Sequence, residues 1–199
     1  MSLEGIENIN EYYGAHFLEA IFPSLVQNCP QERVVAFRNL WQDHFQRQFE
    51  RREERALNIT AELTQVAKVV ESLGYGRIKQ EVRDVDRIPV PIVQETTLDD
   101  GAPFAWWIVV NSDKEQEVDD LQTRFVPELY PETEVPETLP TEPVEDIISN
   151  AVFKLDEAPR FVLVIGHSKI SLLDKGKWRE KRMLRFDLDE ILSRREGNT

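Results

Sequence analysis

The sequence predicts an α+β (mixed α/β) fold, in which helices flank a central mixed sheet of about four to five strands. Three observations support this prediction. Apolar residues recur at helical spacing through residues 1–74, whereas β-branched and alternating residues dominate from residue 75 onward. Near the C-terminus, two apolar runs flank a short polar connection that contains a glycine, which is the pattern of a β-hairpin.

Residues 1–74 form the predicted helical part. A first helix is expected over residues 6–26, and a second begins at residue 32 and ends in the charged run 46–55. A third helix is expected over residues 61–73, and Gly74 follows as a C-terminal stop, because glycine adopts the left-handed conformation at low cost. The charged run indicates a solvated helix face with local ion pairs rather than a nucleic-acid contact.

Residues 75–112 are predicted to form the first hairpin. Its strands are expected over residues 90–97 and 104–110, joined by the tight-turn signal Asp99 to Gly101. Prolines near the start of the first strand favour an edge position or a strand entrance. Both faces of the second strand are apolar, so we expect a central strand that is covered on both sides.

Residues 113–143 are predicted to be an acidic, proline-rich excursion at the surface, and this range is called the acidic segment below. Residues 113–146 hold twelve acidic and two basic residues, and therefore ten of the thirteen net negative charges of the chain. Such a segment repels itself and has few core-forming residues. The net charge of −13 argues against a stand-alone nucleic-acid binder, but the rest of the chain is nearly balanced.

Residues 144–199 are predicted to form a helix, a second hairpin and a final helix. The expected elements are a helix over residues 144–154, strands over 161–165, 170–173 and 183–186, and a helix over 188–195. Asp187 lies three residues before Glu190, which fits an N-cap with its capping-box partner. Residues 1–199 are thus expected to form a single domain.

Several chemistries are excluded or disfavoured by composition. Cys29 is the one cysteine, which excludes an internal disulfide and a cysteine zinc cluster and favours a reducing, cytoplasmic setting. No apolar run approaches the roughly 20 residues that span a bilayer, and no P-loop or dinucleotide-binding glycine motif is present. His16, His44 and His167 lack metal-ligand spacing. The first two are expected on helix faces, and His167 in a solvent-facing turn.

The first hairpin carries carboxylates in a layout that resembles nucleases of the PD-(D/E)xK class. These enzymes hold Mg²⁺ with an acid at the start of one strand and an acid-x-Lys pair on its neighbour. The candidates here are Glu95, Asp100, Asp113 and Lys114, with Asp100 and Asp113 as metal ligands. None of the eight lysines has an acid two residues before it, so a standard site is absent and cleavage is not expected. Asp100 also fits a plain β-turn.

A cationic segment, residues 175–185, follows the second hairpin. Its candidate DNA-binding residues are Lys175, Lys177, Trp178, Arg179, Lys181, Arg182 and Arg185. The cations would contact phosphates, and the tryptophan would stack or pack. A solvated strand-and-turn surface is the simpler interpretation of the same residues.

Residues 159–196 contain an apolar strand after Pro-Arg, the turn LLDKGKW, the step LRFDLDEI and the ending SRRE. These motifs, together with LGYG at residues 73–76 and DDGAPF at residues 99–104, resemble the N-terminal region of a family of large bacterial DNA adenine methyltransferases. The family serves restriction–modification and phage defence. The resemblance implies a restriction-endonuclease-like module that precedes the methyltransferase region of one cytoplasmic polypeptide.

The resemblance further implies that the chain is a fragment of a longer protein. The family often carries an acid-x-Lys nuclease site in this region, and the lack of that pair here argues against cleavage activity. Its partners would be DNA and a downstream methyltransferase domain, and S-adenosylmethionine would bind only to that domain. No cofactor is expected in this chain, and Mg²⁺ only if the nuclease site is active. Two alternatives stay open: a metal-dependent nuclease that uses Glu95, Asp100 and Asp113 as non-standard ligands, and a protein-interaction module that uses the acidic segment.

Overall fold

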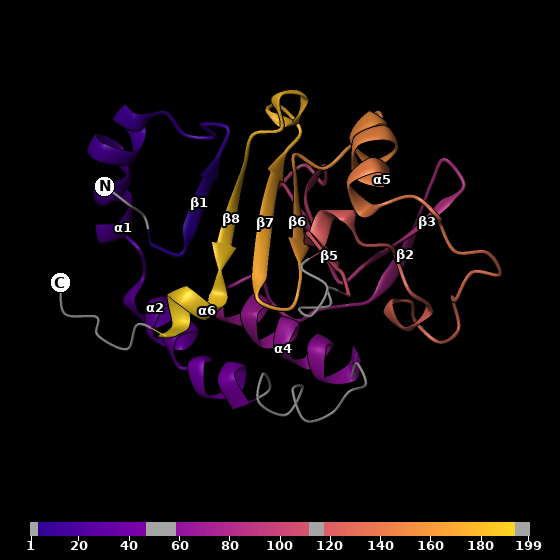
Figure 1. Cartoon of the computed structure of the whole chain (residues 1–199), viewed down its shortest axis with the longest axis horizontal. Coiled ribbons are helices and arrows are strands. Elements are labelled where there is room, and N and C mark those ends of the chain that lie inside the picture. The colour runs from indigo at the N-terminus through magenta and orange to yellow at the C-terminus, as the bar shows by residue number, and fades with distance from the viewer. Residues whose placement is uncertain (1–3, 47–58, 112–117, 194–199) are drawn as a thin grey trace.

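The fold is built on a six-stranded mixed sheet, seen in a computed structural model that describes residues 4–46, 59–111 and 118–193 (Figure 1). In spatial order its strands are β1 (Ile6–Ile9), β8 (Met183–Asp187), β7 (Lys169–Asp174), β6 (Phe161–Ile165), β5 (Pro103–Val109) and β4 (Gln94–Thr97). Neighbouring strands are antiparallel except β5 and β6, which are parallel. Helices accompany this sheet, so the predicted α+β class is confirmed, with more strands than expected.

Strand β1 replaces the start of the helix predicted over residues 6–26. It pairs antiparallel with β8, and Asn10 and Glu11 then adopt positive φ angles that turn the chain. The prediction was wrong here because local periodicity takes no account of β8, which is distant in sequence. The unpaired edge groups of β8 are satisfied by the backbone of β1.

The rest of the first third is helical, as predicted, but in shorter pieces. The elements are the π-helical turn η1 (Phe17–Ile21), α1 (Phe22–Gln27), α2 (Gln31–Arg38), a helical stretch over 41–46, and α4 (Ile59–Ser72). Helix α4 confirms the third predicted helix, and Gly74 follows it with a φ of +88°. Most of the charged run, residues 47–55, lies outside the described residues.

The strand predicted over residues 90–97 is divided into two. Strand β3 (Ile88–Ile92) pairs with β2 (Glu81–Val85) in a separate two-stranded ribbon, whereas β4 pairs with β5. Proline lacks the N–H that a central strand must donate, so a ribbon accommodates the prolines of β3 better than the middle of the large sheet would.

The described part of the acidic segment, residues 118–143, packs against the body of the protein through its apolar residues. Leu121, Phe125, Leu129 and Tyr130 are buried, and the Tyr130 hydroxyl donates to the carbonyl of Pro89 at 2.9 Å. The elements from here to β6 are η3 (Asp120–Gln122), η4 (Pro127–Leu129), α5 (Val144–Asn150) and η5 (Val152–Lys154). Together they form the long crossover that a parallel β5–β6 pair requires.

The C-terminal part follows the prediction most closely. Strands β6 and β7 form the second hairpin, η6 (Trp178–Glu180) leads to β8, and α6 (Leu188–Ser193) ends the described chain. The Asp187 carboxylate accepts the Glu190 N–H at 3.0 Å, which confirms the predicted N-cap. Because β5 pairs with β6, both predicted hairpins contribute to one sheet.

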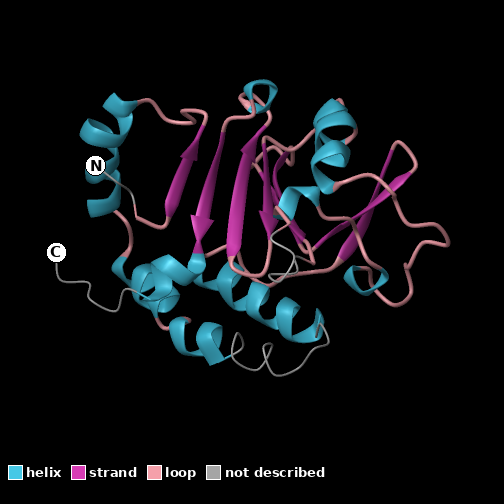
Figure 2. Cartoon of the chain, in the orientation of Figure 1, coloured by secondary structure: helices cyan, strands magenta, loops and turns pink. Residues whose placement is uncertain are grey.

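The central strand β5 is covered on both sides, as its sequence predicted. Trp107 and Ile108 point to opposite faces, and both are 0% exposed. Figure 2 shows α2, α4 and α6 gathered near one end of the sheet, with α5 at the other end near β5 and β6. Of the helices in the described ranges, none has both the length and the apolar composition needed to cross a membrane.

Candidate functional site

Glu95, the first candidate metal ligand, lies on β4 opposite Trp106 of β5. The Trp106 indole N–H donates to Oε1 at 2.8 Å, and Arg83 donates to Oε2 at 2.5 Å. Arg83 also pairs with Glu81 at 2.9 Å, and a hydrogen bond from Lys79 holds the pKa of Glu81 below its usual value. Both oxygens of Glu95 therefore serve contacts within the protein.

Asp100, the second candidate, lies in the turn that joins β4 to β5. Its Oδ1 accepts the N–H of Ala102 at 3.0 Å, and the neighbouring Gly101 has a φ of +86°. These are the contacts of the β-turn alternative. Asp113 and Lys114 follow the other end of β5 in the sequence and lie outside the described residues. Among residues 4–46, 59–111 and 118–193, no three His, Cys, Asp or Glu side chains are grouped to hold a metal ion.

One lysine and two arginines of the cationic segment form ion pairs with carboxylates. The pairs are Lys181 with Glu145 at 2.5 Å, Arg182 with Glu180 at 2.6 Å, and Arg185 with Asp119 at 2.6 Å. Asp119 and Glu145 belong to the acid-rich stretch 113–146, so the two oppositely charged parts of the sequence partly neutralise each other. This pairing reduces the charge that these three cations offer to DNA.

The other members of the segment differ in their surroundings. Trp178 is only 6% exposed and donates to Ser149 Oγ at 2.6 Å, so it packs inside the protein. Lys177 donates to the Tyr12 carbonyl at 2.7 Å. Lys175 and Arg179 are exposed, and neither has an ion-pair partner within the described parts of the chain.

Two buried histidines pair with carboxylates on helices. His44 is 0% exposed, and its Nε2 lies 2.7 Å from Asp189 Oδ1 of α6. His167 lies in the turn between β6 and β7, 3.3 Å from Glu62 of α4. Because α4 covers this turn, His167 is 6% exposed, and the prediction that it faces solvent was wrong. His16 is exposed.

A groove of about 530 Å³, called the aromatic groove below, lies on the sheet face to which Trp107 points. Eight of its 15 lining residues are aromatic: Tyr12, Tyr13, Phe37, Tyr75, Phe104, Trp107, Phe161 and Phe186. Its volume is in the range of ligand-binding pockets. The sequence carries no signal for this groove, because these residues come from separate elements that only the fold brings together.

An ion pair between Arg160 and Asp174 lies beside this groove. The guanidinium donates to both carboxylate oxygens, at 2.8 and 3.1 Å, and the Gly176 N–H donates at 2.8 Å. Burial favours a higher pKa for Asp174, but these hydrogen bonds outweigh it and hold the pKa of the carboxyl below its usual value. Burial and the charge of Asp174 raise the pKa of Tyr12, whose hydroxyl lies 3.5 Å from that carboxylate.

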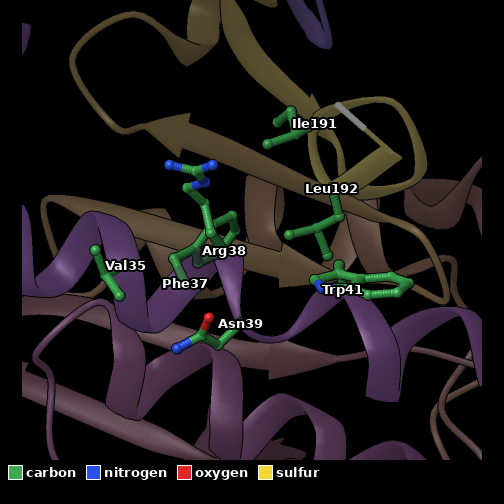
Figure 3. Close-up of a pocket in the computed structure, with 7 residues that line it drawn as sticks. All are labelled: Val35, Phe37, Arg38, Asn39, Trp41, Ile191 and Leu192. Atoms are coloured by element: carbon green, nitrogen blue, oxygen red, sulfur yellow. The ribbon is translucent and has the colours of Figure 1, made fainter. Parts of the chain in front are cut away.

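A second cavity of about 250 Å³ lies between α2 and α6 (Figure 3). Val35, Phe37, Arg38, Asn39, Trp41, Ile191 and Leu192 line it. Phe37 and Ile191 also line the aromatic groove, so these two residues border both spaces.

Comparison with family models, with curated proteins and with solved structures gives no match in any of the three. The structure itself defines an α+β protein with a six-stranded mixed sheet and a two-stranded ribbon.

Proposed function

We propose that this chain is a restriction-endonuclease-like module of a cytoplasmic bacterial DNA-modification enzyme, and that it supports DNA binding without cleaving DNA. Two features support the proposal. Residues 159–196 resemble the N-terminal region of DNA adenine methyltransferases, and α4 precedes an antiparallel hairpin whose turn holds Asp99 and Asp100. This is the layout on which the nuclease-like interpretation depends.

The hydrogen bonds that Glu95 accepts argue most directly against cleavage. A catalytic carboxylate must offer its oxygens to a divalent ion. Here Trp106 and Arg83 engage both oxygens, and a metal that displaced them would leave a partly buried indole N–H without an acceptor. Such an unsatisfied group costs about 1–3 kcal/mol. The contacts therefore favour a structural role for Glu95.

In this proposal DNA is contacted by the whole enzyme, and the chain contributes its exposed cations. In the described parts of the chain, Lys175 and Arg179 are exposed without an ion-pair partner, and Lys177 pairs with no carboxylate either, so these three cations of the segment are the candidates for phosphate contact. S-adenosylmethionine would bind to a downstream methyltransferase domain, and Mg²⁺ would have no role in this chain.

The test is incubation of the chain with supercoiled plasmid in millimolar Mg²⁺ or Mn²⁺. We expect the plasmid to stay supercoiled and calorimetry to detect no Mn²⁺ binding. Nicking that is lost in Glu95→Gln or Asp100→Ala, but retained in the exposed-acid control Asp156→Asn, would refute the proposal. That outcome would establish the alternative of an active nuclease with non-standard ligands.

A further inference from the structure

The lining of the aromatic groove indicates which kind of ligand it suits. Aromatic residues make up 9% of the chain but eight of the 15 lining residues. Sites for acyl chains need only aliphatic bulk, whereas flat rings also stack on other planar groups. Tyr12 and Trp107 are buried, and the other six aromatic residues are half-buried or exposed. The lining therefore favours a planar, unsaturated ligand.

Two cations lie against aromatic rings of the groove. Lys177 Nζ lies 4.1 Å from the ring centre of Tyr12 and 5.0 Å from that of Tyr13, and Arg160 Cζ lies 5.4 Å from that of Phe161. The nearby carboxylate of Asp174 is 2% exposed and already paired with Arg160. Positive charge therefore dominates at these contacts, which suits an anionic ligand.

The groove is longer than a single ring. Its lining extends from Phe104 on β5 to Phe186 on β8, which is three inter-strand steps, or about 14 Å. Sheets with aromatic residues on one face stack two or three bases of a single strand in this way. No charged or amide side chain belongs to the lining among the described residues, so recognition would depend on stacking and tolerate different sequences.

We propose that the aromatic groove binds single-stranded nucleic acid. Unpaired bases stack on rings such as Phe104 and Phe161, and phosphates lie near Lys177 and Arg160. The inference deepens the proposed function and rests on it for the choice of DNA as the biological ligand. It specifies that the groove takes an unpaired segment, because the bases of an intact duplex are stacked on each other.

Fluorescence anisotropy of the full chain with a fluorescein-labelled oligothymidylate tests this inference. We expect saturable binding at low salt, tighter than to a duplex of the same length. Phe161→Leu keeps apolar bulk but removes the ring, so affinity falls about five- to 150-fold, the range of one base–aromatic stack. Val35→Ala, an exposed apolar position outside the aromatic groove, leaves affinity unchanged.

The salt dependence tests the phosphate contact separately. Lys177→Gln reduces the slope of log affinity against log salt by about 0.7, whereas Lys154→Gln, an exposed lysine elsewhere, does not. Equal affinity for duplex and single strand, no binding at all, or equal affinities of Phe161→Leu and Val35→Ala would each overturn the inference. Plasmid nicking refutes the proposed function alone, because it does not measure binding in the groove.

Discussion

Replacing Arg160 by alanine tests the ion pair beside the aromatic groove. Asp174 is 2% exposed and the Arg160 side chain is 57% exposed, so the two partners differ in what their removal leaves behind. Without the arginine, the buried carboxylate keeps the Gly176 N–H, a long contact to Tyr12 and the more distant charge of Lys177. Breaking a buried pair costs about 3–5 kcal/mol, and the exposure of the arginine lowers our expectation to about 2–3 kcal/mol of unfolding free energy.

Urea denaturation at pH 7, followed by circular dichroism, measures this loss. Arg179→Ala, an exposed arginine without an ion pair among the described residues, is the matched control and should change stability by less than about 0.5 kcal/mol. Asp174→Asn added to Arg160→Ala removes the buried charge and should recover about 1 kcal/mol. If Arg160→Ala costs no more than the control, the pair does not contribute as its geometry indicates.

The same pair predicts a pH dependence of definite sign. The pKa of Asp174 is lower in the folded chain than the unfolded value of about 3.9, so its stabilising contribution is complete above that value. The contribution is lost as the pH falls through the folded pKa. The stability difference between the native chain and Arg160→Ala should therefore shrink as pH falls from about 5 to about 2, and a constant difference would contradict this explanation.

Three further predictions follow from buried contacts. A methyl group on Gly166 would lie 2.1 Å from the Asp120 carboxylate, so Gly166→Ala should lower the unfolding free energy by about 1–3 kcal/mol. Gly14 has open space around it, so Gly14→Ala should not have this effect. Equal urea midpoints for the two variants would contradict the prediction. Trp178→Ala should cost about 3–5 kcal/mol in the same assay, and a loss below about 1 kcal/mol would show that the side chain is not packed as described. Burial raises the pKa of Tyr130 to about 12, so Tyr130→Phe should reduce the tyrosinate absorbance change near pH 12 and not near pH 10.

Elements with local signals were predicted well from the sequence. The β6–β7 hairpin has two apolar runs and a short turn, and α6 begins at an aspartate whose capping contact is formed. Strand β1 was missed, because its formation depends on β8, about 175 residues later in the chain. Propensity and periodicity describe a segment alone, and they fail where a distant backbone satisfies its hydrogen bonds.

The candidate site was predictable in residue types but not in partners. Glu95 has the chemistry of a metal ligand, and only the pairing of β4 with β5 shows that the Trp106 indole N–H donates to one of its oxygens. Trp178 lies among cations in the sequence, and only the fold shows that it is buried against Ser149. The aromatic groove had no sequence signal, because its lining is assembled by tertiary structure.

The net charge of the sequence likewise differs from the charge that the folded surface presents. In the sequence, Asp119 and Glu145 add to the net charge of −13, which argues against nucleic-acid binding. Arg185 and Lys181 belong to the cationic segment, which argues for it. In the folded chain these residues pair with each other, so neither count describes the surface that a ligand meets. If the aromatic groove binds nucleic acid as proposed, the cations that contribute most are those placed against its aromatic rings, above all Lys177, because their charge and the stacking surface would act on the same ligand.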